Sequence, residues 1–424
     1  MSSYASIYVN DKEVFSYRNE IHPEASCVFS PQDLRELAGK EALEFAHGAY
    51  DITGLDEQEI DEIHLLVYQA SAAIIRDRLD VLGYNMKMVE MVFGQLVEDS
   101  LQIYDRSRWG IEEHESYREV IAFHDARKEY YESLTFLGWK DRVAEHVRSK
   151  QAAEHPELRD VGPLELFESV DERVLLRLIA EVVDPADVFT LDVTDLEEGG
   201  WLDDRDAISE LVDLDGSIAV RPPIIITEGQ YDARILQDAL NLLMPHLSSY
   251  IRFLDYEFGN EGGAAAVVKT LKSFAAAGIT HRVIGLFDND SAAYEAASAL
   301  HGIKLPPYYY IIHYPDLELA QAYPTLGPQG EVVMDVNRLA CSIELYLGRD
   351  VLTENNGKLT PVQWKGYMSK VRAYQGEILD KGRVQKAFAG KMKAARADAR
   401  LIETQDWSGI ISIFDAIINT LRAA

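Results

Sequence analysis

Carboxylate side chains stand where two apolar, β-rich segments of this sequence end. Glu228 closes the segment PIIITEG, and Asp232 follows four residues later, on the same face of the helix expected there. Asp288 and Asp290 close a second segment, HRVIGLFDND. Gathered carboxylates repel one another unless a cation neutralises them, and their hard oxygen atoms suit Mg²⁺ or Mn²⁺. We therefore expect Glu228, Asp232, Asp288 and Asp290 to bind one of these metal ions.

A simpler explanation is that acids follow strands because loops are polar. For any one of these acids, taken alone, that explanation is the better one. The acids are flanked, however, by Gly229 and by Gly262-Gly263, which follows another expected strand. Four acids that the fold brings together beside such glycines favour the metal site.

Short apolar segments alternate with helical ones after Arg221-Pro222-Pro223, a pair of prolines that marks a domain boundary. The segments are unbroken and β-rich, as expected for strands covered on both faces, and span 223–229, 251–256, 281–290 and 308–314. This alternation predicts a four-stranded parallel sheet with crossover helices. Ligands of such sheets bind beyond the carboxyl ends of the strands, where the acids lie.

The first half of the chain has a different pattern. Residues 5–17 alternate around Asn10-Asp11 and predict a short β-hairpin. Apolar spacings of three and four predict amphipathic helices over 32–48, 56–80, 86–104, 115–136 and 139–153. We expect a mainly α-helical domain over 1–153, an acidic connector or edge subdomain over 154–220, the α/β domain over 221–336, and a basic α-helical region over 337–424.

The charge is unevenly distributed. The chain has 71 acidic and 41 basic residues, and residues 1–220 hold 49 of the acids but only 20 of the bases. Residues 358–400, in contrast, contain 11 bases and 3 acids. This basic stretch is either a phosphate-binding face, or a solvated helix surface, or a surface that docks on the acidic part of its own chain.

Composition excludes several classes of protein. A hydrophobic content of 47% excludes disorder as the main state, and a net charge of −30 excludes a protein that coats nucleic acid with its whole surface. Cys27 and Cys341 cannot form a disulfide framework or a cysteine-rich zinc site. Because no apolar run is long enough to span a membrane and the start is not typical of a signal peptide, we expect a soluble cytoplasmic protein without a membrane partner.

The strand ending in Glu228-Gly229 and the later strand ending in Asp288-Asn289-Asp290 resemble the Toprim domain. This domain occurs in topoisomerases, primases, small ribosomal RNA maturases and OLD-family nucleases, and EGQYD is closer to the nuclease branch. RLDVLGY at 78–84, SIELYLG and WKGYMSKVRAYQGEILDK also resemble bacterial proteins described as HEPN/Toprim-associated, many of them in presumed antiphage defence loci. The implied fold is an α/β, Rossmann-like Toprim domain behind a shared N-terminal module.

The resemblance implies roles for particular residues. Glu228, Asp232, Asp288 and Asp290 would bind one or two Mg²⁺ ions, with Glu228 also placed as general base, and Glu344 would complete the second metal site. Lys381 would neutralise the attacked or leaving phosphate, although it is also one lysine of a basic stretch. The nucleic acid, DNA or a tRNA-like RNA, would lie on the basic C-terminal face formed by Lys365, Lys370, Arg372, Lys381, Arg383 and Lys386.

The sequence departs from the resembled families in two respects. Ser291-Ala292-Ala293 stands after the paired aspartates, where family members often carry a glycine. No GxxxxGK[ST] motif occurs, so the ATPase that OLD-type nucleases carry in the same chain is not encoded here. We expect control to come from a regulatory protein or an ATPase partner, or to be independent of nucleotide.

A competing site lies in the N-terminal half. HEPN ribonucleases use an Arg and a His, four to six residues apart on a helix, for phosphate binding and proton transfer. Arg108 with His114 and Arg118 with His124 match this spacing. Such pairs also arise by chance, and surface histidines of a bundle used for dimerisation or partner binding are the better explanation of them.

These observations lead to one main functional hypothesis and two alternatives. We expect a Mg²⁺-dependent endonuclease that hydrolyses DNA or structured RNA, acts in antiphage defence and forms a homo-oligomer. The first alternative is a non-catalytic, Toprim-like sensing or scaffold module of a defence complex. The second is a metal-independent HEPN-type ribonuclease.

Overall fold

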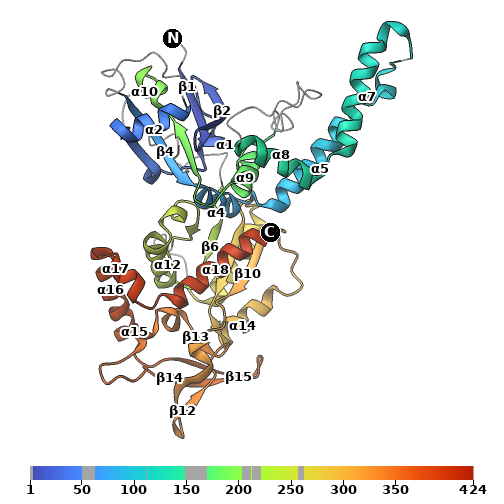
Figure 1. Ribbon diagram of the computed structural model, residues 1–424. Helices are drawn as coiled ribbons and strands as arrows, with labels where there is room; N and C mark the ends of the chain where they lie inside the picture. Colours follow the sequence, from blue (N-terminus) through green and yellow to red (C-terminus); the bar gives the residue numbers. More distant parts are fainter. Residues whose placement is uncertain are drawn as a thin grey trace. The chain divides into compact units, whose positions relative to one another are not determined.

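A computed structural model describes residues 3–49, 63–111, 113–148, 170–202, 212, 221–255 and 262–423. The chain divides into two compact units, Met1–Val220 and Arg221–Ala424. Each unit has its own sheet and core (Figure 1). No helix among the described residues is long and apolar enough to cross a membrane.

The N-terminal unit is built on a five-stranded antiparallel sheet of order β2-β1-β5-β4-β3. Its strands are β1 (Tyr4–Val9), β2 (Lys12–Arg18), β3 (Leu34–Ala38), β4 (His64–Ser71) and β5 (Val188–Asp192). The expected hairpin is confirmed, with Asn10 at a positive φ in its turn. The expectation of a mainly α-helical domain is wrong, because residues expected in helices form β3 and β4.

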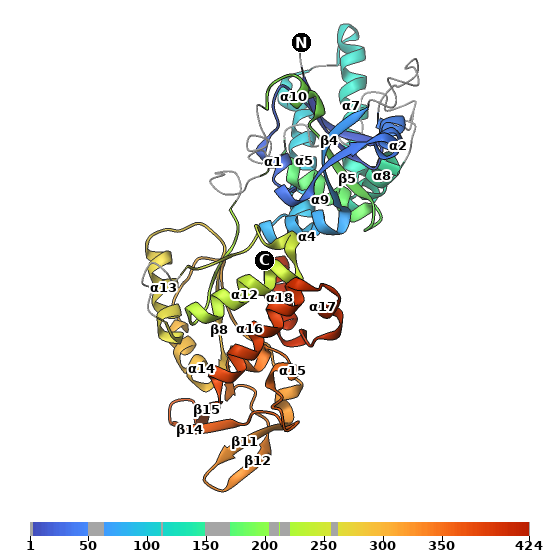
Figure 2. The ribbon, with the colours of Figure 1, turned by 90° about the vertical axis from the view of Figure 1, so that its left-hand side faces the viewer.

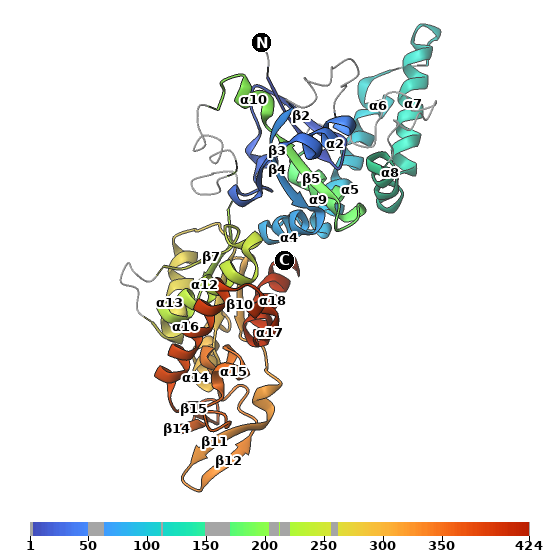
Figure 3. The same cartoon turned by 60° about the vertical axis from the view of Figure 1, so that its left-hand side comes forward.

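The helices of this unit are α1 (Pro23–Ser26), α2 (Gly39–Ala49), α4 (Ala72–Leu82), α5 (Met86–Ile103), α6 (Arg106–Trp109), α7 (Arg118–Ser133), α8 (Phe136–Arg148), α9 (Glu172–Val182) and α10 (Thr194–Glu198). Short 3₁₀ turns, η1 (Pro31–Asp33) and η2 (Glu115–Tyr117), precede β3 and α7. The helices expected over 86–104 and 115–136 are confirmed, and α7 packs along α5 (Figure 3). Residues 50–62 and 149–169, which include parts of other expected helices, lie outside the described residues.

Buried ion pairs join the helices under the sheet. Helix α9 is buried along most of its length and packs against α4, α5 and α8. Its Arg177 donates from Nε to Asp80 of α4 at 2.7 Å, and both side chains are less than a tenth exposed. Arg78, on the same helix as Asp80, is 1% exposed and donates to Asp33 in the η1 turn. Each buried charge thus meets a partner, which is the condition under which such charges are tolerated.

Strand β5 lies in the middle of the N-terminal sheet, between β1 and β4. It belongs to the stretch 154–220, which the sequence indicated as a connector or edge, so its central position is a correction. Phe189 and Leu191 of β5 are both fully buried. Most of the acidic residues that gave this stretch its loop-like appearance lie outside the strand.

The C-terminal unit contains the expected four-stranded parallel sheet, of order β10-β8-β6-β7. Its strands are β6 (Ile224–Ile226), β7 (Arg252–Phe253), β8 (Val283–Phe287) and β10 (Tyr309–His313). The connections are α12 (Gln230–Leu243) with η4 (Pro245–Leu247), α13 (Ala264–Ala276), and α14 (Ser291–Ala297) with η5 (Ser298–Leu300). Right-handed crossovers with this strand order put α12 on one face of the sheet and α13 with α14 on the other (Figure 2).

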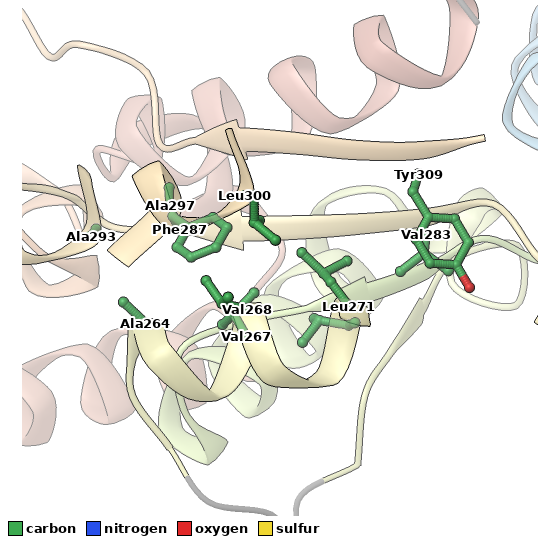
Figure 4. Packing of buried hydrophobic residues seen from close by; sticks show 11 residues of the cluster. Ala264, Val267, Val268, Leu271, Val283, Phe287, Ala293, Ala297, Leu300 and Tyr309 are labelled. Carbon is green, nitrogen blue, oxygen red and sulfur yellow. The ribbon is translucent and has the colours of Figure 1, made fainter. Parts of the chain in front are cut away.

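The core on the α13 face is closely packed (Figure 4). Val267 and Leu271 of α13 meet Val283 and Phe287 of β8, and all four are fully buried. Gly285 lies between the latter two on the same face of β8, and a Cβ atom there would come within 2.7 Å of the Leu271 side chain. Glycine at this position lets α13 approach closely the strand that leads to Asp288.

The region after residue 336 is not purely helical. Its strands β14 (Val362–Met368) and β15 (Ala373–Ile378) join β11 (Tyr323–Gly327) and β12 (Gly330–Met334), which precede residue 336, in a second four-stranded sheet of order β12-β11-β14-β15. The first part of the basic stretch therefore forms a hairpin, and only its second part is helical. The remaining elements are β9 (Asn289–Asp290), β13 (Ala340–Cys341), η6 (Leu319–Ala322), η7 (Ile343–Tyr346), α15 (Arg349–Leu352), α16 (Lys381–Ala397), α17 (Arg400–Thr404) and the expected closing helix α18 (Ser408–Ala423).

The central position of β5 can be tested by mutation. Leu191→Ala removes a fully buried side chain from β5 and should lower the free energy of unfolding by about 2–5 kcal/mol. Leu137→Ala is the matched control, because this leucine is 67% exposed and should cost little. Urea unfolding followed by circular dichroism measures both. A Leu191→Ala protein as stable as the control would contradict a central β5.

Candidate active site

The carboxyl ends of β6 and β8, which are adjacent in the sheet, deliver the acids predicted from the sequence. Glu228 follows β6, and Asp232 lies in the first turn of α12, which begins right after Gly229. Asp288 follows β8. Asp290 is the N-cap of α14, where its side chain accepts a hydrogen bond from the backbone N–H of Ala293 at 2.8 Å.

Glu228 is held by backbone groups from two neighbouring loops. Its Oε1 accepts a hydrogen bond from the backbone N–H of Asp288 at 2.9 Å, and its carbonyl oxygen accepts one from Gly263 at 2.5 Å. A Cβ at Gly262 would lie 3.2 Å from the same carbonyl, and Gly263 has a φ of +95°. The glycine pair noted in the sequence thus lets the α13 loop close over Glu228.

The acids share one buried environment. Burial, opposed by the hydrogen bond from Asp288 and reinforced by the charge of Asp290, raises the pKa of Glu228 to about 7. Burial and then the charges of Glu344 and Glu228 raise the pKa of Asp232 to about 7. The pKa of Asp288 lies well above its usual range because of burial and the same neighbouring carboxylates. Burial also raises the pKa of Asp290. These five carboxyl groups form the carboxylate cluster: Glu228, Asp232, Asp288, Asp290 and Glu344.

Glu344 joins the cluster through the pairing of two very short strands. Ala340 and Cys341 of β13 pair with Asp290 and Asn289 of β9, and the chain then turns into η7, where Glu344 is 2% exposed. Its Oε2 accepts a hydrogen bond from the Ser342 hydroxyl at 2.6 Å. The sequence pointed to Glu344 only through the family resemblance, because no local pattern predicts this long-range pairing.

Lys381 supplies positive charge to the cluster from the first turn of α16. Its Nζ lies 3.6 Å from Oε2 of Glu344, whose other oxygen accepts a hydrogen bond from Gln385 at 3.0 Å. The ammonium group also lowers the pKa values of Glu228, Asp232 and Asp290. The Lys381 side chain is 41% exposed, so it reaches both the buried acids and solvent.

The donor chemistry of the cluster fits a divalent cation. Oδ1 of Asp288 is buried and has no hydrogen-bond partner. An unsatisfied buried carboxyl oxygen is costly, and a bound cation would satisfy it. Carboxylate oxygens are the ligands that Mg²⁺ and Mn²⁺ prefer. Across the described residues, however, no group of three or more acidic, histidine or cysteine side chains is already arranged to hold a metal ion. Binding would therefore require side chains of the cluster to draw together.

Two tyrosines beside the cluster were missed in the sequence. The hydroxyl groups of Tyr231 and Tyr314 are buried without a hydrogen-bond partner. Burial raises the pKa of each, and the charges of Asp232 and other cluster acids raise it further. Tyr314 directly follows β10, so the rule that pointed to the acids, the first residues after each parallel strand, would have found it.

His313 contacts the backbone of the loop that follows β8. A ring nitrogen of His313, Nδ1, lies 2.9 Å from the carbonyl oxygen of Asp288, and its ring stacks on Tyr294 at 3.9 Å. Ser291, the first residue after the paired aspartates, is 1% exposed and donates a hydrogen bond to the carbonyl of Tyr374 at 3.3 Å. The serine thus ties this loop to β15.

Several predicted nucleic-acid contacts are engaged within the chain. Lys365 pairs with Glu377 at 2.5 Å and Lys370 with Glu295 at 2.8 Å, both on the surface, where such pairs are weak. Arg383 is committed to the fold, since it donates to the carbonyls of Val351 and Leu352 and to the Thr360 hydroxyl. Arg372 and Lys386 are exposed and form no ion pair with the described residues.

The two N-terminal Arg/His pairs differ in how their residues are placed on the helices. Arg108 lies in α6, which ends at Gly110 in a left-handed conformation, while His114 caps the η2 turn. Arg118 and His124 both lie on α7, at the spacing expected from the sequence. The His124 ring packs 5.7 Å from the ring of Tyr104.

Comparison with known proteins bears on the N-terminal unit. A family model described as HEPN/Toprim N-terminal domain 1 matches residues 1–213, half of the chain. No curated protein and no solved structure matches the chain significantly. The match ends before the unit that carries the carboxylate cluster.

The raised carboxyl pKa values predict a pH dependence of stability in the metal-free protein. Protonation favours the folded state, and this contribution is complete below the carboxyl pKa of the unfolded chain, about 4, and is lost as pH rises through about 7. Lowering the pH from about 8 to about 6 should therefore raise the Tm measured in EDTA. Asp288→Asn should raise the Tm at pH 8 and flatten this dependence. A wild-type Tm that falls over this interval would refute the expectation.

Proposed function

The chain belongs to the HEPN/Toprim N-terminal domain 1 family, and from this membership we propose that its C-terminal unit is a Toprim-type, metal-dependent nuclease. Its substrate class is DNA or structured RNA, and its reaction is phosphodiester hydrolysis. The single observation that carries the proposal is the carboxylate cluster at the carboxyl ends of β6 and β8, with the unpartnered Oδ1 of Asp288 inside it.

The energetic cost of the cluster supports a catalytic role. Burying like charges together destabilises a fold, and a scaffold has no need to keep them. Strongly perturbed pKa values in groups that share one site are typical of catalytic centres. The carboxyl groups of Glu228, Asp232, Asp288 and Asp290 have raised pKa values, and burial is the largest cause for each.

The residues divide into ligands and a base. Asp232, Asp288, Asp290 and Glu344 would hold Mg²⁺ or Mn²⁺. When bound, the ion would polarise a phosphate oxygen and favour ionisation of water. Glu228 is suited to accept a proton from the attacking water, because a base works best with a pKa near the operating pH and that of Glu228 is about 7. The hydrogen bond from the Asp288 backbone holds its carboxylate in place.

Lys381 would act on the substrate phosphate. In the metal-free protein its ammonium group faces Glu344, at 3.6 Å, and offsets part of the negative charge of the cluster. A cation in the cluster would take over that task and leave Lys381 to face a phosphate oxygen. Arg372 and Lys386, which form no ion pair with described residues, would contact the flanking phosphates.

Family membership supports a proposal about the cellular role. We propose that the protein is an effector in a bacterial antiphage defence system, that it acts as a homo-oligomer, and that a regulatory protein or an ATPase gates it. The acidic first half, with 49 acids and 20 bases in residues 1–220, would repel nucleic acid and confine the substrate to the C-terminal unit.

A non-catalytic sensing or scaffold module is the second candidate. It is favoured by the lack, among the described residues, of a ready-made group of three metal-ligating side chains. In this case the cluster would bind no metal and cut no nucleic acid. Metal binding separates the two candidates before any substrate is known.

Cleavage tests the proposal directly. Purified protein is incubated with plasmid DNA and with total tRNA, in Mg²⁺, in Mn²⁺ and in EDTA. Metal-dependent cleavage should fall by about 100-fold or more in Glu228→Gln, the range expected for loss of a general base. Asp238→Asn is the matched control, because Asp238 lies on α12 but pairs with Arg396 outside the cluster. Cleavage in EDTA that His124→Ala abolishes would instead place the activity in the N-terminal unit.

Thermal unfolding tests the metal site without a substrate. An ion that binds only the folded state stabilises it by about 2.7 kcal/mol at about 100 times its Kd. Mg²⁺ or Mn²⁺ should therefore raise the wild-type Tm and leave that of Asp288→Ala/Asp290→Ala unchanged. An equal rise in both proteins would show that the ion binds elsewhere, and no rise in either would favour the scaffold.

A further inference from the structure

An unusual aromatic surface lies on the β14–β15 hairpin. Tyr367 and Tyr374 are directly opposite each other in the antiparallel register, with ring centroids 5.1 Å apart. Their side chains are 56% and 57% exposed. The Trp364 ring lies 6.3 Å from that of Tyr374, so the exposed pair continues into a third aromatic residue. We call Tyr367 and Tyr374 the tyrosine pair.

Three of the four charged residues in the hairpin that carries the pair are basic, Lys365, Lys370 and Arg372, and the fourth is Glu377. Between Asn355 and Gly376 the chain has Lys358, Lys365, Lys370 and Arg372 and no acid. Lys370 and Arg372 lie in the turn between the strands, directly beyond the tyrosine pair. In a chain with a net charge of −30, this is a local surface complementary to a polyanion.

The same hairpin borders the carboxylate cluster. The carbonyl of Tyr374 accepts the hydrogen bond from Ser291, the residue after Asp290, and the Gln375 side chain donates to Asp290 and lowers its pKa. Because side chains alternate along a strand, Gln375 and Tyr374 point to opposite faces of the hairpin. One face therefore contacts the site, and the other presents the tyrosine pair.

We propose that the tyrosine pair stacks on unpaired bases of the nucleic-acid substrate next to the bond that the carboxylate cluster cleaves. This inference rests on the proposed nuclease function and specifies its substrate class: nucleic acid with unpaired nucleotides. Exposed aromatic rings between basic residues are the combination that binds single strands, because every base offers a π-face and every nucleotide a phosphate. A continuous duplex hides these base faces, so it would gain only the phosphate contacts.

The two faces of the β14–β15 hairpin would bind different parts of a nucleic-acid strand. The phosphates near the cleaved bond would lie on the face that carries Gln375, next to Asp290. The neighbouring unpaired nucleotides would pass the basic turn and stack on the tyrosine pair. A partner protein fits this surface less well, because it would have to be strongly acidic and also bury a pair of tyrosines.

Binding in EDTA tests the stacking without cleavage. Fluorescence anisotropy is measured with a labelled single-stranded DNA, an RNA of the same sequence and the matched DNA duplex. Tyr367→Ala/Tyr374→Ala should weaken binding of single strands about fivefold or more, the low end of base–aromatic stacking, and duplex binding by less than about twofold. Tyr367→Phe/Tyr374→Phe should keep wild-type affinity, because phenylalanine preserves the ring.

Controls separate this inference from the nuclease proposal. Tyr117→Ala removes a tyrosine of similar exposure, 53%, from the N-terminal unit and should change nothing. Unaltered single-strand affinity in the double alanine variant, with an unchanged Tm, would overturn the stacking. If that variant still cleaved with a need for Glu228, the nuclease would stand without the stacking. Selective loss of single-strand affinity in a protein that never cleaves would support the stacking and refute the nuclease.

Discussion

The C-terminal unit is organised around mutual repulsion between carboxylates in a place with little water. Five acids converge there, and burial raises the pKa of the Asp288 carboxyl well above its usual range. The fold offsets part of this cost with neutral donors: a backbone N–H to Glu228, the start of α14 to Asp290, and Ser342 and Gln385 to Glu344. Lys381 adds the one ammonium group that faces Glu344 among the described residues. The remaining imbalance, on Asp288, is what a metal ion would correct.

Elements that are distant in sequence bring the residues of the carboxylate cluster together. A parallel sheet places Glu228 and Asp288 side by side although 60 residues separate them. The two-residue pairing of β9 with β13 brings in Glu344, and α16 then covers it with Lys381 and Gln385. The β14–β15 hairpin, tied to Ser291, forms the rim. The region after the parallel sheet therefore completes the site.

The parallel sheet could be read from the sequence because its strands are continuous apolar runs bounded by glycine, proline and acids. The four acids at its edge followed from the same rule. Strand β4 of the N-terminal unit could not be predicted from the sequence. It runs directly into α4 at Ala72 without a glycine or proline, and the joined segment has helix-like apolar spacing. The β14–β15 hairpin was not predicted, because the lysines of this stretch were interpreted as part of a solvated helix surface. The role of Arg383 depends on carbonyls from distant residues, which no local pattern reveals.

The central position of β5 constrains how this protein is made. Strands β1 and β4 pair with each other only through β5, and β5 is complete only at Asp192. A ribosome synthesises the chain from its N-terminus, so β1 leaves the exit tunnel long before its neighbour exists. The N-terminal sheet closes only after Asp192 has been synthesised, and until then the edges of β1 and β4 lack their shared neighbour. The strand order therefore leaves two strand edges open to intermolecular pairing for as long as β5 is missing.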